Sequence, residues 1–310
     1  MEKISIVVPT YNSQDCLEEL VTQIQKNVKN YEVILVNDCS LDNSWEVIKK
    51  ISSSNDNVKG INLMKNTGQD NAIMAGLHFV TGDYIVIMDD DLQHDPSDIS
   101  SLYNALLGGY DVCYANFSRK EHAMWKNFGS WLNGKIAEIV IEKPREVYLS
   151  PYKIMKRKIA DEILKYTGPY PYIDGLIFRL TKSITQIDAR HSQRFAGKSN
   201  YSLATSVKVS LKLATSFSVI PLRISSFVGF AASSIAVLLA AYYMIEYFTS
   251  GISIEGWTSL TLILLFLGGM ILISLGMIGE YVGRMYMLTN NMPQFTIRET
   301  CSNAFTKKTE

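Results

Sequence analysis

The sequence predicts an α/β domain with a mostly parallel sheet, followed by two transmembrane helices. Short apolar runs alternate with helical stretches in the front half of the 310-residue chain, which is typical of a parallel sheet crossed by helices. Charged residues are unevenly distributed. Residues 206–310 hold seven Lys or Arg and five Asp or Glu, whereas residues 1–205 hold 23 and 25. The front two-thirds is therefore charged like a water-soluble domain, and the remainder is not.

The expected strands and helices of the front half can be placed in order. The strands are residues 4–8, 31–36, 58–63 and 84–88, and the helices are residues 16–28, 44–51 and 72–80. Polar residues follow three of these strands: Pro9 to Asn12, Asn37 with Asp38, and Asp89 to Asp91. Ligands of such sheets bind beyond the carboxyl ends of the strands. The sequence therefore predicts a binding site at this edge.

Two long uncharged segments predict the transmembrane helices. Residues 224–245 form 22 consecutive residues without a charge, and residues 256–279 form 24. At about 1.5 Å per residue, helices over these segments are roughly 33 and 36 Å long, close to the thickness of the hydrocarbon core. Buried core helices are usually shorter and interrupted by polar positions.

The flanks of the two segments predict their orientation. Basic residues lie on the outer flanks of the pair, whereas the connecting loop has two acids and no Lys or Arg; the basic residues are Lys208, Lys212, Arg223 and Arg284. The positive-inside rule then places both termini in the cytoplasm. Glu280 and Arg284 are four residues apart and could pair on one helix face. A snorkelling arginine beside a boundary glutamate is an equal alternative.

The chain is expected to have six parts. They are a cytosolic domain (1–198), an amphipathic juxtamembrane segment (199–222), a first span (223–248), a short external loop (249–255), a second span (256–280) and a cytosolic tail (281–310). The juxtamembrane segment fits a helix lying in the membrane interface, and a plain connecting helix fits it equally well. The tail is expected to be mobile after Pro293.

Composition excludes several other classes of protein. The chain has 30 basic and 30 acidic residues, so its net charge does not favour binding to nucleic acid. The four cysteines form no CxxC pair, which argues against a disulfide framework and favours a reducing compartment; they are Cys16, Cys39, Cys113 and Cys301. The stretch before Pro9 has no run long enough for a signal-peptide core, so we expect the front domain in the cytosol.

Three consecutive acids, Asp89, Asp90 and Asp91, follow the strand at residues 84–88. Neighbouring carboxylates are costly without a counter-charge. Carboxylate oxygens are ligands of Mg²⁺ or Mn²⁺, which commonly bridge to substrate phosphates, and Gln93 could share the metal with Asp91. A solvated turn would explain three acids alone. Their place at a strand end, beside other polar strand ends, favours a site for a metal and a diphosphate.

The order of the motifs resembles the inverting family 2 glycosyltransferases of GT-A fold. The motifs are Val7-Val-Pro-Thr-Tyr-Asn12, Val36-Asn-Asp38, Asn66-Thr-Gly-Gln69, Gly82-Asp83 and Met88-Asp-Asp-Asp-Leu-Gln93. With two C-terminal spans and the ending Gly276-Met-Ile-Gly-Glu-Tyr-Val-Gly-Arg284, the chain is similar to polyprenyl-phosphate glycosyltransferases. These include bactoprenol glucosyltransferases, undecaprenyl-phosphate aminoarabinose-type transferases and dolichol-phosphate mannose synthases.

The resemblance implies a role for each matching residue. Nucleotide-sugar binding falls to Pro9, Tyr11, Asn12, Asp38, Gly68, Asp89 and Asp90, with Asp38 on the base, and the metal ligands are Asp91 and Gln93. The implied contacts to the acceptor phosphate are Arg119, Lys126, Ser130, Arg194 and Lys198. The resemblance assigns the reaction itself to Asp89, Asp91, Arg119 and Arg194. His191 is more simply explained as structural than as catalytic.

One departure from the family bears on the acceptor. Many relatives carry an acid in a Gly-Asp-Phe-Arg-like motif, where this chain reads Tyr148-Leu-Ser-Pro-Tyr-Lys-Ile-Met155. A sugar hydroxyl would need a general base, whereas a phosphate monoester is largely ionised at neutral pH. The missing acid therefore favours a lipid-phosphate acceptor. Asp174 stays a candidate for positioning or proton handling, with a helix cap as the alternative.

These observations predict transfer of a sugar from a nucleotide sugar to a polyprenyl phosphate at the cytosolic face of the inner membrane, with inversion. UDP is implied by the resemblance, GDP is its main competitor, and undecaprenyl phosphate is the expected lipid. The alternatives are a membrane-anchored nucleotide-sugar binding protein without turnover and a transferase with a hydroxyl acceptor. A polysaccharide synthase would need more spans. Glycines such as Gly268, Gly276 and Gly283 could allow helices of two copies to pack closely.

Overall fold

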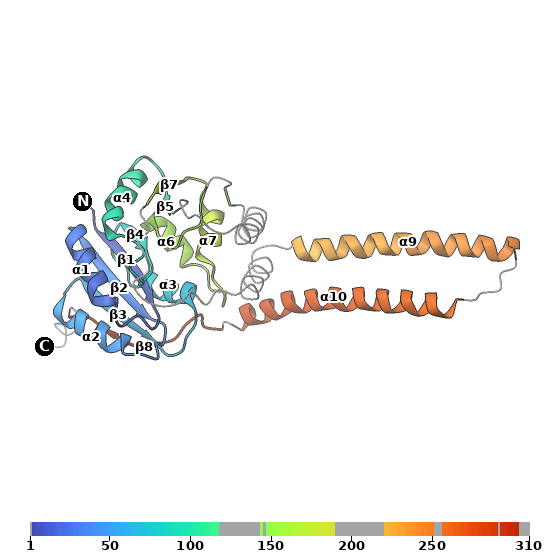
Figure 1. Ribbon diagram of the computed structural model, residues 1–310, viewed down its shortest axis with the longest axis horizontal. Helices are drawn as coiled ribbons and strands as arrows, with labels where there is room; N and C mark the ends of the chain where they lie inside the picture. Colours follow the sequence, from blue (N-terminus) through green and yellow to red (C-terminus); the bar gives the residue numbers. More distant parts are fainter. Residues whose placement is uncertain are drawn as a thin grey trace. The chain divides into compact units, whose positions relative to one another are not determined.

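The computed structural model describes residues 2–117, 143–144, 147–189, 220–250, 256–290 and 292–303. The chain forms two compact units. One comprises Met1–Leu203 together with Asn291–Glu310, and the other comprises Ala204–Asn290. The first is an α/β domain, and the second contains a pair of long helices (Figure 1).

The α/β domain is built on one eight-stranded sheet with the order β7-β5-β6-β4-β1-β2-β3-β8. The strands are β1 (Ile4–Thr10), β2 (Tyr31–Asn37), β3 (Val58–Leu63), β4 (Tyr84–Ile87), β5 (Val112–Asn116), β6 (Lys153–Lys156), β7 (Ile184–Asp188) and β8 (Ile297–Cys301). Strands β1 to β4 pair in parallel, and so do β5 and β7. Strand β6 is antiparallel to both neighbours, and β8 is antiparallel to β3. The predicted, mostly parallel sheet is confirmed.

Helices cover both faces of the sheet (Figure 1). They are α1 (Leu17–Asn27), α2 (Ser44–Ser54), α3 (Gln69–Leu77), α4 (Ile99–Leu107), α6 (Arg157–Ile163) and α7 (Ile173–Leu180), with a short 3-10 helix at Pro96–Asp98. Helices α1, α2 and α4 contribute to one apolar cluster with the strands. Helix α3 packs on the opposite face, where a Cβ on Gly76 would lie 2.5 Å from Val7 Cγ1. Glycine at this position therefore lets α3 approach the sheet.

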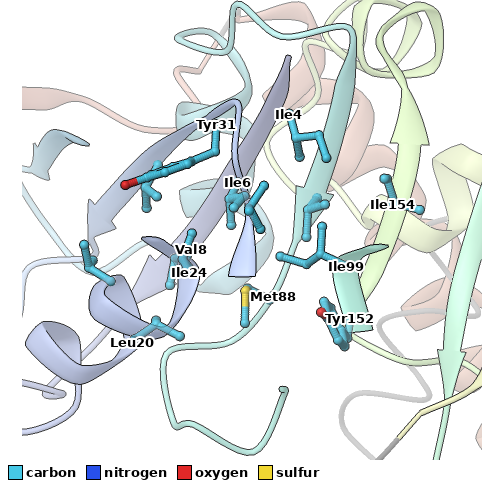
Figure 2. Close-up of a cluster of buried hydrophobic side chains, with 14 of the residues drawn as sticks. Ile4, Ile6, Val8, Leu20, Ile24, Tyr31, Met88, Ile99, Tyr152 and Ile154 are labelled. Carbon is cyan, nitrogen blue, oxygen red and sulfur yellow. The ribbon is translucent and has the colours of Figure 1, made fainter. Parts of the chain in front are cut away.

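The core explains why the central strands read as continuous apolar runs. Every residue of β1 and β2 is buried, because helices cover both faces of a parallel sheet. Figure 2 shows the α1 and α4 side of this core, where Leu20 and Ile24 of α1 lie near Ile6 and Val8 of β1. All four of these side chains are 5% exposed or less. The carboxyl ends of the strands are thereby held in one rigid row.

The tail after the second helix is not a mobile end. Residues 297–301 form β8 at the edge of the sheet, paired with β3 from Gly60↔Cys301 to Leu63↔Ile297. The expectation that the chain is mobile after Pro293 is wrong for this stretch. The reason is tertiary: β3 would otherwise present an unpaired edge, and a strand that covers it satisfies the exposed backbone groups.

The second unit contains α9 (Ile220–Ser250) and α10 (Trp257–Thr289). Ser225 Oγ of α9 and Ser274 Oγ of α10 lie 2.8 Å apart in a hydrogen bond. Among the described residues, one helical stretch, Phe266–Thr289, is long and apolar enough to cross a membrane, with a mean hydropathy of 1.6. A shorter apolar stretch covers Ser225–Leu239. By length and composition the described residues thus contain one candidate span, and it extends beyond the expected end at residue 280.

Glu280 and Arg284 form an ion pair inside that stretch. Arg284 Nη2 and Nε lie 2.7 and 3.0 Å from Glu280 Oε1. Of the two alternatives left open by the sequence, the structure shows the i,i+4 pair. Most of the juxtamembrane segment and of the external loop, residues 199–219 and 251–255, lies outside the described residues.

A buried carboxylate stabilises the end of the sheet opposite the polar strand ends. Glu32 of β2 has a side chain that is 4% exposed and pairs with Lys3 at 3.1 Å and Lys59 at 3.0 Å. Burial by itself raises the pKa of this carboxyl. Hydrogen bonds from Ser5, Thr81 and Lys59 outweigh burial and lower the pKa from 4.5 to about 2.

We therefore predict that Glu32 makes the α/β domain sensitive to acid. Because the folded pKa lies below the unfolded one, its contribution, on the order of 3 kcal/mol, is present above about pH 5 and is lost as the pH falls towards 2. Urea unfolding of the full chain in detergent should show a steeper loss of stability from pH 5 to 3 for wild type than for Glu32→Gln. Glu46→Gln, which removes an exposed pair with Lys49, should behave like wild type. Equal slopes for wild type and Glu32→Gln would contradict the prediction.

Candidate functional site

A pocket of about 320 Å³ lies beyond the carboxyl ends of the parallel strands. Strand β1 has β2 on one side and β4 on the other. The chain leaves β1 through α1 on one face of the sheet and reaches β4 through α3 on the opposite face. Such a switch in strand order opens a crevice, and it is where ligands of open α/β sheets bind. The pocket is lined by Pro9, Thr10, Tyr11, Asp38, Asn66, Gly68, Gln69, Ala72, Asp89, Asp90 and Asp91.

The pocket brings together most of the predicted nucleotide-sugar residues. Seven of the sequence candidates line it: Pro9, Tyr11, Asp38, Gly68, Asp89, Asp90 and Asp91. Asn12 and Gln93 are candidates that do not line it. The remaining candidates, Arg119, Lys126, Ser130, Arg194 and Lys198, lie outside the described residues, as does His191. Gln69 and Asn66 line the pocket without having been candidates, although both belong to the Asn66-Thr-Gly-Gln69 motif.

Asp38 holds the loop between β3 and α3. Its two carboxylate oxygens accept hydrogen bonds from Thr67 N at 2.7 Å, Thr67 Oγ1 at 3.1 Å and Gly68 N at 2.8 Å. The residue is 4% exposed. Gly68 has a φ of 89°, a left-handed conformation that glycine adopts at little cost. Asp38 therefore shapes one wall of the pocket through the backbone, besides lining it.

The acidic turn after β4 is half-buried and hydrogen-bonded to the other walls of the pocket. Gln69 Nε2 donates to Asp89 Oδ1 at 2.7 Å, and Tyr11 N donates to Asp90 Oδ2 at 3.2 Å. Burial, followed by repulsion from Asp91 and Asp90, raises the pKa of Asp89 to about 7. Burial also raises the pKa of Asp90 to about 6, against the hydrogen bonds that lower it. Ionising both groups at once is costly, so the turn favours a positively charged ligand.

The described residues contain no cluster of three or more His, Cys, Asp or Glu side chains arranged to hold a metal ion. Asp91 Oδ1 accepts a hydrogen bond from Gln93 N at 3.1 Å, within the turn. Carboxylates still suit the chemistry of a hard divalent ion. Mg²⁺ is usually held by one or two carboxylates together with substrate phosphates, rather than by a complete protein cage.

His94 holds the backbone of the acidic turn by a hydrogen bond. Its Nδ1 accepts a hydrogen bond from Asp89 N at 3.1 Å. The ring is stacked on Phe117 and on Tyr152, with centroids 5.4 and 5.0 Å apart and nearly parallel planes. His94 is 4% exposed. Phe117 and Tyr152 lie far from His94 in the sequence, next to β5 and β6, so the sequence alone gives no sign that His94 supports the acidic turn.

An ion pair between a buried lysine and a half-buried aspartate lies at the same end of the sheet. Strand register aligns Lys153 of β6 with Ile87 of β4 and with Tyr114 of β5. Lys153 Nζ pairs with the Asp174 carboxylate of α7, which also accepts a hydrogen bond from Tyr114 Oη at 2.8 Å. The positive charge of Lys153 lowers the pKa of Asp89, against burial and the neighbouring acids. The N-cap of α7 is Tyr172, so the alternative that Asp174 is a helix cap is wrong.

We predict that Lys153→Met destabilises the domain by about 3 kcal/mol, because it leaves the Asp174 carboxylate buried without its partner. Lys153→Met combined with Asp174→Asn removes both charges and keeps an acceptor for Tyr114, so it should recover part of the loss. Denaturant unfolding of the three proteins measures both effects. A double variant no more stable than Lys153→Met would contradict this prediction.

Comparison with known proteins agrees with the geometry of the site. The model of the family described as Glycosyl transferase family 2 matches residues 5–164. An uncharacterized glycosyltransferase of Bacillus subtilis, YkcC, is 30% identical over 302 residues, which cover 96% of this chain and 93% of the relative. An undecaprenyl-phosphate 4-deoxy-4-formamido-L-arabinose transferase of Pseudomonas fluorescens is 30% identical over 312 residues, which cover 97% and 90%.

A solved structure shows the same fold. Glucosyl-3-phosphoglycerate synthase from Mycobacterium tuberculosis, in complex with Mn²⁺, UDP and glucosyl-3-phosphoglycerate, has a TM-score of 0.52 at 16% identity. The match covers 69% of this chain and 78% of the other. With its mostly parallel sheet and a pocket at the strand ends, the chain belongs to glycosyl transferase family 2 and is a glycosyltransferase of GT-A-like α/β fold.

Proposed function

We propose that this glycosyltransferase moves a sugar from a nucleotide sugar, UDP-linked, to a membrane polyprenyl phosphate with inversion at the anomeric carbon. The observation that carries the proposal is the gathering of Pro9, Asp38, Gly68 and the three acids in one pocket at the strand switch point. A lipid-phosphate acceptor is supported by the relatives named as undecaprenyl-phosphate transferases, which match nearly the whole chain. The pocket volume is within the range of small-molecule sites.

The donor end of the proposed reaction is the acidic turn. Asp91, with Gln93, would hold a Mg²⁺ or Mn²⁺ ion, and Asp89 and Asp90 would contact the nucleoside side. When bound, the ion would offset the negative charge of the diphosphate. Solved structures of the same fold in complex with Mn²⁺ and UDP support a divalent metal in this proposal. The chain's own contribution is to hold the turn in place through Gln69 and His94.

No general base is needed to activate the sugar acceptor when the attacking group is a phosphate. A phosphate monoester has a second pKa near 6 and is largely dianionic at pH 7. The Asp174 carboxylate pairs with Lys153 and accepts a hydrogen bond from Tyr114, so these two partners already occupy the carboxylate that could otherwise accept a proton from a sugar hydroxyl. We propose that Arg119, Lys126, Ser130, Arg194 and Lys198 bind the acceptor phosphate, where Arg and Lys would form charge-assisted hydrogen bonds.

The proposed enzyme acts at the cytoplasmic face of the inner membrane. Two spans, over residues 223–248 and 256–280, would anchor it with both termini in the cytoplasm. The apolar stretch Phe266–Thr289 supports one span, and the uncharged run of residues 224–245 supports the other. Anchoring confines the enzyme and its lipid substrate to one surface, which raises their effective concentration. Pairing of two copies through the glycines of α10 belongs to the same proposal.

We predict that Asp91→Asn loses transfer activity by a factor of about 100 or more, because a neutral amide is a poor ligand for the proposed ion. The assay follows radiolabelled sugar from UDP-sugars into organic-extractable polyprenyl phosphate, with and without Mg²⁺ or Mn²⁺. Asp161→Asn, which removes an exposed pair with Arg157 on α6, is the matched control and should keep wild-type activity. Full activity of Asp91→Asn would refute the metal assignment.

We also predict that the acceptor preference is strict. Undecaprenyl phosphate should accept the sugar, and undecaprenol should not, because only the phosphate is already ionised. Mass spectrometry of the lipid product identifies the bond that forms. Transfer to the free alcohol would support a hydroxyl acceptor instead, and tight UDP binding without transfer to any acceptor would support a non-catalytic binding protein.

A further inference from the structure

The segment that follows α10 returns to the sheet and contacts two loops. We call residues 292–303 the return segment. Thr296 O accepts from Met64 N at 2.8 Å, where β3 runs into the loop that Asp38 holds. Gln294 Nε2 donates to Tyr166 O at 2.8 Å and to Gly168 O at 2.7 Å, in the stretch between α6 and α7. The return segment is thus attached to both loops just before β8 pairs with β3.

A chain of side-chain hydrogen bonds runs inward from the return segment. Glu299 Oε1 of β8 accepts from Asn62 Nδ2 of β3 at 3.2 Å. Asn62 Oδ1 accepts from Asn37 Nδ2 of β2 at 2.8 Å. The two asparagines are 7% and 2% exposed, and each uses its amide as both donor and acceptor. A buried amide that loses one partner keeps an unsatisfied polar group, so these links depend on one another.

The chain of hydrogen bonds ends at the pocket wall. Asn37 Oδ1 accepts from Ser40 N at 3.3 Å, and Ser40 Oγ accepts from Asn12 N at 3.0 Å. Asn12 follows Tyr11, which lines the pocket and donates its N–H to Asp90. Cys39 and Asn12 both have left-handed backbone angles, with φ of 57° and 54°. Such conformations persist where surrounding contacts hold them.

We propose that the return segment is a positioning element of the nucleotide pocket, and that Glu299 is its positioning residue. Glu299 would act through Asn62 and Asn37 on the turns that carry Ser40 and Asn12. Glu299 is not among the residues that line the pocket. The inference rests on the proposed function only in naming the ligand as a nucleotide. The coupling between β8 and the two turns is a property of the chain alone.

The experiment compares Glu299→Ala, Glu299→Gln and Trp45→Phe in the full chain in detergent. Glu299→Gln keeps an oxygen that can accept from Asn62. Trp45→Phe removes the Trp45 Nε1 bond of 2.7 Å to the same Glu299 oxygen and leaves the Asn62 bond in place. Amide hydrogen exchange of peptides covering residues 37–44 reports on the turn, and calorimetric titration with UDP reports on the pocket.

We expect Glu299→Ala to speed exchange in residues 37–44 and to weaken UDP binding by about threefold or more, because Asn62 loses a hydrogen-bond partner. Glu299→Gln should show the exchange rate and the UDP affinity of the wild type. Trp45→Phe should lower the melting temperature without changing either. If amide exchange in residues 37–44 is unchanged in Glu299→Ala, the inference is overturned, whatever the affinity for UDP. A wild-type protein that binds no UDP refutes the proposed function, and the exchange result then still decides this inference.

Discussion

The desolvation of neighbouring carboxylates at the end of β4, together with their repulsion, is the constraint on which the site depends. Asp89 and Asp90 lie side by side in a half-buried turn, and their partial removal from water raises their pKa values to about 7 and 6. Nearby groups partly relieve the repulsion: Gln69 and the Tyr11 N–H donate to the two carboxylates, and Lys153 adds a positive charge. The remaining imbalance favours a ligand that brings a cation with it, as a metal-bound diphosphate does.

The walls around the acidic turn are held by side chains bonded to backbone. Asp38 fixes the loop before α3, and the turns after β1 and β2 are tied to each other. Ser44 Oγ accepts from Ser13 N at 2.9 Å, and Gln14 Oε1 accepts from Asn43 N at 2.9 Å. Polar groups that are oriented before a ligand arrives need little reorganisation when it binds. The fold therefore supplies a pre-arranged site on the ends of rigid strands.

The residues that line the pocket could be predicted from the sequence, whereas the side chains that hold them in place could not. Pro9, Tyr11 and Asp38 follow strands that are apolar throughout, and parallel strands bring their carboxyl ends together, so their grouping could be predicted. Lys153 and His94 could not be found in this way. Lys153 lies close enough to affect Asp89 because β6 runs antiparallel beside β4. A single lysine in an apolar strand forms no sequence pattern that predicts such a position. Asn12 does not line the pocket, and its side-chain Oδ1 accepts a hydrogen bond from Leu41 N; its predicted contact with the nucleotide stays a prediction.

The first four strands, the three helices among them, the polar strand ends and the family could all be predicted from the sequence. These features depend on local periodicity and on motifs that lie close together in the chain. The edge strand at residues 297–301 and the pairing of Asp174 with Lys153 became visible in the fold alone. Both have the same cause. An edge strand and a buried ion pair each depend on a partner far away in the sequence, and the free energy of that pairing is not encoded in either segment alone.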